Sequence, residues 1–164
     1  MAPSASIATQ FTATLPDWLV AELPALPRRI ESQEERANLV TRLSDRNWRE
    51  GNGGPFAAIV IDHDTGELVS VGVNVVLSSG LSSTHAEVVA LTLAQAHTGH
   101  WDLGASRNLE LVVNWHPCVM CYGALIWSGV RHLVLAGAGP ECEEPAVFSE
   151  YGKSSATVYN ASRR

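Results

Sequence analysis

Apolar and polar positions alternate with two different periods along the chain, and each change of period marks a new element. Apolar residues near helical spacing predict a first helix, which the run Gly51–Gly54 ends. Two β-rich runs flank the segment Asp62–Gly66, which predicts a hairpin. A loop of Ser and Gly at 78–83 precedes the next helix. In chain order we predict a helix over 30–49, strands over 55–61 and 68–76, a helix over 84–97, a strand over 109–115, a helix over 117–128 with Pro117 at its first position, and a strand over 131–136.

This α-β-β-α-β-α-β order predicts an α/β fold of three layers, α/β/α. Crossover helices between strands favour a mixed central sheet that is covered on both faces. Residues 1–27 are rich in Ala, Ser and Thr and hold four prolines, so they predict an irregular N-terminal arm with one short turn near Asp17–Leu19. Residues 28–164 then form a single domain, since the chain is long enough for one core.

Charge, apolar runs and cysteine content indicate which partners and which cell compartment to expect. The net charge is −6, and Lys and Arg cluster only at Arg28-Arg29 and Arg163-Arg164, which disfavours nucleic acid as a partner. No apolar run has the length of a membrane span, so we expect no membrane association. Three cysteines cannot close a disulfide framework, and two of them are spaced Cys-x-x-Cys, which favours a cytoplasmic location.

Two short motifs carry the candidate chemistry, and each opens a predicted helix. They are His85-Ala86-Glu87 and the run Pro117–Cys121. Cysteines at i and i+3 share one helical face, so Cys118 and Cys121 can reach one ion. A helix N-terminus also favours the thiolate form. One imidazole with two thiolates is a typical zinc ligand set that leaves a fourth position for water.

His85 and Glu87 are two positions apart, which is about 200° of rotation on a regular helix. Both can face one cleft only if His85 lies at the helix entrance, where we therefore expect it. Zinc lowers the pKa of a bound water towards neutrality. Glu87 is then the expected catalytic residue, which takes this proton and returns it to the ring nitrogen and leaving amine of a nitrogen heterocycle.

The same residues also have purely structural interpretations. Thr84-x-x-Glu87 matches a capping box, which would give Glu87 a structural role. Cys118 and Cys121 alone could form a redox pair or half of a structural zinc site. A structural site needs four protein ligands, and Cys142 and His116 are the candidates for the fourth, although His116 would also suit a helix cap. The joint occurrence of both motifs at helix starts favours catalysis.

His-x-Glu followed by Pro-Cys-x-x-Cys resembles the signature of the cytidine-deaminase-like zinc hydrolases. Over about residues 50–140 the chain also resembles the bacterial guanine deaminases within that superfamily. This resemblance implies a cytidine-deaminase-like fold, a zinc cofactor and the conversion of guanine to xanthine and ammonia. The segments that carry it are Gly53–Ala58, Val71–Asn74, Thr84–Leu91 and Pro117–Ala124.

The resemblance also implies which side chains bind the base. Asn74 would hydrogen-bond the ring, while Phe56, Ala57 and Trp115 would contact or line the pocket. It implies a homodimer whose C-terminal segment completes the partner's pocket, where Glu150 is the closest match to an acidic residue of the family. Without the resemblance, Asn74 is a polar residue that ends a strand and Phe56 belongs to the core.

The sequence departs from the family pattern in two places. His116 stands where a glutamate usually precedes Pro-Cys, which changes a charge beside a metal ligand. Only 28 of the 164 residues follow Ala136, fewer than the family usually has. We expect a guanine deaminase, and another small heterocycle (cytosine, a nucleoside or an aminotriazine) stays open as substrate, as does a zinc-stabilised binding module without activity. The scarcity of basic clusters makes a tRNA adenosine deaminase the weaker alternative.

Overall fold

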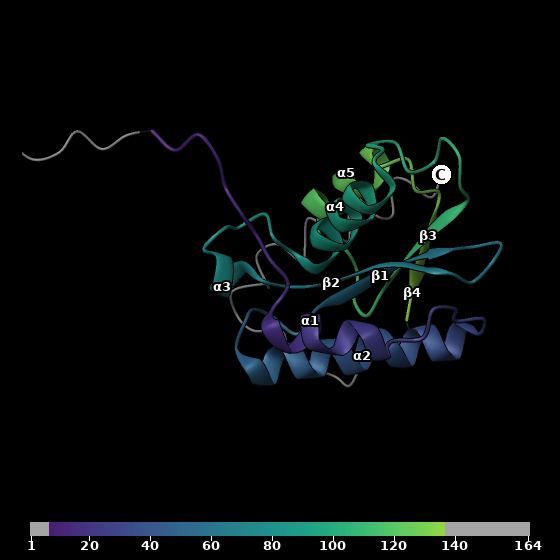
Figure 1. Ribbon diagram of the computed structural model, residues 1–164, viewed down its shortest axis with the longest axis horizontal. Helices are drawn as coiled ribbons and strands as arrows, with labels where there is room; N and C mark the ends of the chain where they lie inside the picture. Colours follow the sequence, from purple (N-terminus) through teal and green to yellow (C-terminus); the bar gives the residue numbers. More distant parts are fainter. Residues whose placement is uncertain (1–6, 137–164) are drawn as a thin grey trace, which may run out of the picture.

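The computed structural model describes residues 7–136, which are built around a mixed sheet of four strands (Figure 1). The strands lie in the order β2-β1-β3-β4. β1 pairs antiparallel with both β2 and β3, whereas β3 pairs parallel with β4, so the predicted mixed sheet is confirmed. The strand bounds are Ala57–Asp62 for β1, Leu68–Val73 for β2, Leu109–Val113 for β3 and His132–Leu135 for β4.

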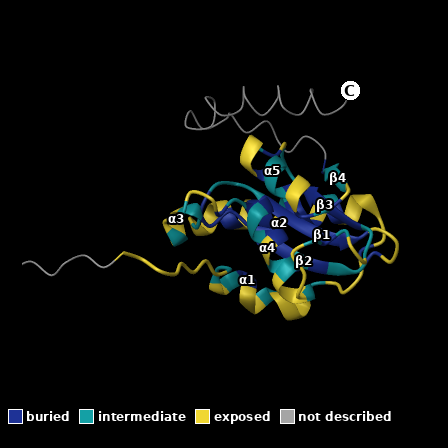
Figure 2. Cartoon of the chain, turned by 90° about the horizontal axis from the view of Figure 1, so that it is seen from above, coloured by how far each residue is buried: buried dark blue, intermediate teal, exposed yellow. Residues whose placement is uncertain are grey.

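Helices cover both faces of this sheet, which gives the predicted three layers (Figure 1). Helix α2 (Gln33–Glu50) lies on one face, and helices α4 (Ala86–Thr98) and α5 (Val119–Trp127) lie on the other. Alternate residues of β1 supply the two cores: Ile59 packs in the core on the α2 side, and Val60 packs in the core below α4 and α5. Figure 2 shows the strands as the buried centre between exposed helix surfaces.

The expected irregular arm over residues 1–27 is wrong for residues 17–25, where the structure has two short helices in place of the single turn predicted near Asp17–Leu19. Helix α1 (Asp17–Glu22) and the 3₁₀ helix η1 (Leu23–Ala25) follow Pro16 there. Leu19 is fully buried in the core beside α2, and the guanidinium of Arg46 lies 4.6 Å from the centre of the Trp18 ring. A six-residue helix is marginal alone, so packing against α2 stabilises what the local sequence did not predict.

Three elements begin or end at residues other than those predicted. The predicted strand over 68–76 stops at Val73, because the Oδ1 atom of Asn74 accepts a hydrogen bond from the backbone N–H of Val76 at 3.1 Å. The short helix α3 (Val76–Ser79) follows where we predicted strand and loop. Helix α5 begins at Val119 rather than at Pro117, with Cys118 as its N-cap residue.

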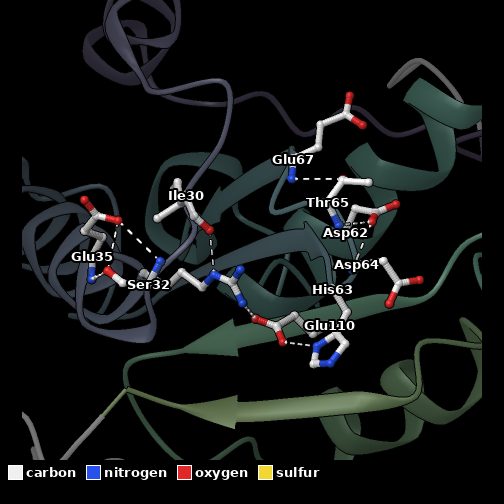
Figure 3. Close-up of polar contacts among 10 residues, drawn as sticks. Ile30, Ser32, Glu35, Asp62, His63, Asp64, Thr65, Glu67 and Glu110 are labelled. Atoms are coloured by element: carbon white, nitrogen blue, oxygen red, sulfur yellow. Dashed lines mark hydrogen bonds and ion pairs between the residues drawn. The ribbon is translucent and has the colours of Figure 1, made fainter.

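A buried ion pair joins α2 to the sheet at the far end from the candidate site. Arg36 of α2 donates to the Oε1 atom of Glu110 at 2.6 Å, and Glu110 is completely buried in β3. Its second oxygen lies 2.8 Å from Nδ1 of His63, as Figure 3 shows, and the His63 ring stacks on His132. Among the described helices, none is both long and apolar enough to cross a membrane.

Candidate active site

The candidate residues gather at one edge of the sheet. β1 begins at this edge with Ala57, which pairs with Val73 at the end of β2. Ala58 pairs with Val113 at the end of β3, and Val113 lies opposite Leu135 of the parallel strand β4. Helices α4 and α5 follow strands that end there, and this topology brings the two sequence motifs together although they are distant in the chain.

Three ligand atoms from these motifs converge on one point. Nδ1 of His85 lies 3.6 Å from Sγ of Cys118 and 3.5 Å from Sγ of Cys121, and the two sulfur atoms are 3.6 Å apart. His85 is the N-cap residue of α4, with extended backbone at φ −66° and ψ 155°. The expected place of His85 at the helix entrance is therefore confirmed, and it leaves Glu87 inside the first turn.

These distances fit a tetrahedral zinc ion. Zn–S bonds of about 2.3 Å and Zn–N bonds of about 2.0–2.1 Å place the nitrogen about 3.5–3.6 Å from each sulfur and the two sulfurs about 3.8 Å apart at tetrahedral angles. Within residues 7–136 the cluster has three members, and His116 is not one of them. Cys142, the other candidate for a fourth ligand, lies outside the described residues. Three protein ligands leave one position for water, as catalytic zinc sites require.

The thiols of Cys118 and Cys121 differ in pKa. Without a bound metal, the hydrogen bond from Cys121 lowers the pKa of Cys118 to about 4, despite the opposing effect of burial. The same hydrogen bond raises the pKa of Cys121, and burial raises it further. A hydrogen bond to Cys118 also raises the pKa of His85. The lowered pKa of Cys118 favours its thiolate form, which is the form that binds a metal.

Glu87 lies beside the ligands and is buried, with 8% of its surface exposed. Burial raises the pKa of its carboxyl group, which suits a residue that must both hold and release a proton near neutrality. The capping-box interpretation of Thr84 and Glu87 is wrong: the N-cap residue is His85, and the Thr84 hydroxyl donates to the carbonyl of Leu81 at 2.7 Å. Its place beside the ligands fits a chemical role for Glu87.

The structure brings most of the predicted base-binding residues to the same edge. Asn74 follows β2 and is 2% exposed, and its backbone N–H donates to the carbonyl of Phe56 at 3.1 Å. Phe56 is half-buried beside β1, and Ala57 is buried as the first residue of that strand. Trp115 is half-buried just after β3. Glu150 lies outside the described residues.

Sequence reasoning missed three polar residues beside these base-contact candidates, two of them buried and one half-buried. Ser44 and Asn47 lie on the buried face of α2, and Asn114 follows β3. All three bond to the backbone at the start of β1 or to Asn74. Their sequence signal was present, because Ser44 and Asn47 interrupt the apolar positions of an otherwise regular amphipathic helix.

Close packing requires a glycine at position 53, in the segment that leads to β1. A Cβ atom on Gly53 would lie 2.2 Å from Oδ1 of Asn74 and 2.4 Å from its carbonyl oxygen. Any other residue at position 53 would displace Asn74. The run Gly53–Ala58 is thus fitted to the amide that follows β2.

Fold and site together define a domain of the zinc-dependent hydrolytic deaminase class. The chain belongs to the family described as the cytidine and deoxycytidylate deaminase zinc-binding region, which matches residues 30–137. This match contains His85, Cys118 and Cys121, so the predicted zinc cofactor agrees with both the family and the geometry.

Individual relatives include both base and tRNA deaminases. The structure of a guanine deaminase from Nitrosomonas europaea is 34% identical, with a TM-score of 0.71 over 92% of this chain and 88% of that chain. A guanine deaminase from Bacillus subtilis is 31% identical over 57% of each chain. A tRNA-specific adenosine deaminase from Buchnera aphidicola is 34% identical over 56% of this chain and 58% of its own length. The chain thus spans rather more than half the length of these two curated relatives.

Proposed function

We propose that this protein is a zinc-dependent aminohydrolase that converts guanine and water to xanthine and ammonia. The observation that carries the proposal is the convergence of His85, Cys118 and Cys121, with ligand atoms 3.5–3.6 Å apart, next to the buried carboxyl group of Glu87. Guanine is supported by similarity to the Nitrosomonas europaea guanine deaminase along nearly the whole of both chains. A related structure, 34% identical with a TM-score of 0.73, contains 8-azaguanine.

The residues present can perform the proton transfers of this reaction. Zinc at this site would lower the pKa of a water molecule and so supply a nucleophile at neutral pH. Glu87 would take a proton from the water and pass it to the ring nitrogen beside the amine-bearing carbon. The new C–O bond forms at that carbon. Glu87 would then take the second proton of the former water from this hydroxyl group and deliver it to the amine, so that the C–N bond breaks and ammonia leaves.

Base recognition is assigned to the pocket at the sheet edge. Asn74 would pair with the polar edge of guanine, since an amide offers both a donor and an acceptor. Phe56, Ala57 and Trp115 would provide apolar contact, and Glu150 would supply a carboxylate for the donors of guanine. We include in the proposal a homodimer, a cytoplasmic location and a role in purine catabolism, on the strength of the family resemblance.

A tRNA adenosine deaminase is the second candidate, favoured by the similarity to the Buchnera aphidicola protein. Against it stands the net charge of −6, because proteins that bind a phosphate backbone need a basic face. The two candidates differ in substrate and share the zinc chemistry.

The deciding experiment measures ammonia release by the zinc-loaded full chain from a panel of substrates. The panel contains guanine, adenine, cytosine, their nucleosides, an aminotriazine and tRNA. Guanine should react fastest, with xanthine as product. Faster reaction of tRNA or of a pyrimidine would keep the zinc mechanism and reject guanine as substrate, while no ammonia from any compound would support a binding module.

A further inference from the structure

We infer that Asn47 of helix α2 is a positioning residue for the base pocket, an inference that rests on the function proposed for that pocket. Asn47 is completely buried. It lies on the α2 side of the sheet, whereas the metal ligands come from α4 and α5 on the other side. It would therefore affect the reaction through the segments that carry Asn74 and Phe56, and not through the metal.

The side-chain amide of Asn47 joins the two segments that carry the proposed base-contact residues. Its Nδ2 atom donates to the carbonyl oxygen of Asn74 at 2.8 Å and to that of Gly54 at 3.1 Å. The first carbonyl follows strand β2, and the second belongs to the loop that leads to Phe56. Because both bonds leave from one nitrogen atom, Asn47 fixes the distance between these two segments.

Asn74 is thereby held from both ends of the residue. Its carbonyl oxygen accepts from Asn47, and its side-chain Oδ1 accepts from the N–H of Val76 at 3.1 Å. The backbone of Gly53 lies directly against the same amide, leaving no room for a Cβ. A side chain held in this way loses little conformational freedom when it binds a ligand.

Two further polar side chains, those of Ser44 and Asn114, bond to the backbone of residues 55–57. The Ser44 hydroxyl donates to the carbonyl of Pro55 at 2.6 Å, and Nδ2 of Asn114 donates to the same carbonyl at 3.0 Å. Oδ1 of Asn114 accepts from the N–H of Ala57 at 2.8 Å. Side chains of α2 and of the residue after β3 therefore hold the loop from Gly54 to Ala57 through its backbone.

The chemistry of Asn47 indicates more than core packing. Asparagine is a poor helix former, and burial of an amide is unfavourable unless its groups are paired. The Oδ1 atom of Asn47 is buried with no hydrogen-bond partner within the described residues. An apolar side chain would avoid this penalty, but it would remove the donor that the carbonyls of Gly54 and Asn74 share.

The test compares Asn47→Leu with Val40→Ala in the full zinc-loaded chain. Leucine keeps the branching of asparagine at Cγ, although it is larger, and removes the donor, whereas Val40→Ala destabilises the same helix at a buried position away from residues 54–57. We expect Asn47→Leu to raise KM for the base about five- to tenfold, the effect of losing the one hydrogen bond that Asn74 would make to the base, with kcat and zinc content changed less. Hydrogen exchange should accelerate at residues 54–57 and 74–76 in this variant only.

Two outcomes would overturn the inference. One is unchanged KM and unchanged exchange in Asn47→Leu; the other is an equal rise in KM in Val40→Ala, which would indicate general destabilisation. If Asn47→Leu does not fold, Asn47→Ser, whose hydroxyl is too short to span both carbonyls, replaces it. Failure of the proposed function is recognised separately: the wild type would not deaminate guanine, KM would be measured on whichever base it does deaminate, and the exchange measurement needs no substrate.

Discussion

The Nδ1 atom of His85 lies 3.5 Å from the Sγ atom of Cys121, although 36 positions separate the two residues in the sequence. This approach depends on two helices that begin at the same edge of the sheet. Each ligand lies within the first turn of its helix or immediately before it, where unpaired N–H groups favour thiolates and anions. The fold therefore determines the metal site through the positions of two helix N-termini.

Removal of one sulfur ligand should release the metal. We expect Cys118→Ser to lose most of its zinc, because two protein ligands bind the ion far more weakly than three. Elemental analysis of purified protein measures this directly. Cys142→Ser is the matched control and should retain about one zinc per chain. Full zinc in Cys118→Ser, or its loss in Cys142→Ser, would mean that a different set of ligands holds the ion.

Glu87→Gln separates chemistry from structure. The amide has almost the same shape as the carboxyl group but cannot transfer protons, so activity should fall by about 10²-fold or more. Zinc content should not change, and the melting temperature should not fall, because the variant no longer buries an ionisable group. Steady-state assays with a thermal melt measure both. A variant with normal turnover and a lower melting temperature would return Glu87 to a structural role.

Much of the fold and the metal site could be predicted from sequence, because both depend on strong local signals. The periodicity located α2, α4, α5 and the four strands to within a few residues, and two motifs gave the metal ligands. Helix α1 was predicted only as a short turn, because its stability comes from contacts of Leu19 and Trp18 with distant residues. Asn47 interrupts the apolar face of α2, but this local signal does not identify its partners. The bonds of Asn47 to Asn74 and of Asn114 to Ala57 join residues far apart in the sequence, which no local pattern encodes.

The buried ion pair of Arg36 and Glu110 should contribute strongly to stability. Removal of one partner leaves the other charge buried and unpaired, so Glu110→Gln should lower the free energy of unfolding by about 3–5 kcal/mol. Urea unfolding measures this. The control is Asp45→Ala, which breaks an exposed pair with Arg49 and should cost less than about 1 kcal/mol. Equal effects of the two variants would contradict the prediction.

Asp62 should make stability depend on pH in the acid range. Burial tends to raise the pKa of this carboxyl group, but hydrogen bonds from the Thr65 backbone and from Arg107 outweigh it and hold the pKa below the ordinary value of 3.8. The unfolded chain therefore binds the proton more readily, so this stabilisation is complete above about pH 3.8 and is lost as the pH falls through the folded pKa. Asp62→Asn should be less stable than the wild type at pH 7, and the difference should shrink below pH 3.8. Unfolding curves with a constant difference at both pH values would refute this.

Asn74 provides the sharpest test of the base pocket. Its amide is buried and held by its neighbours, so a substrate that pairs with it gains a preformed partner, and a substrate that cannot pair leaves it unsatisfied. Asn74→Ala should raise the barrier for guanine, measured as kcat/KM, by about 1–3 kcal/mol, the usual effect of an unpaired buried group. Ser78→Ala is the control, since it removes a hydrogen bond to the Val75 carbonyl in the same turn and leaves the amide of Asn74 in place. An equal loss in both variants would assign Asn74 to the turn alone, whereas a loss confined to Asn74→Ala, with zinc retained, would assign it to recognition of the base.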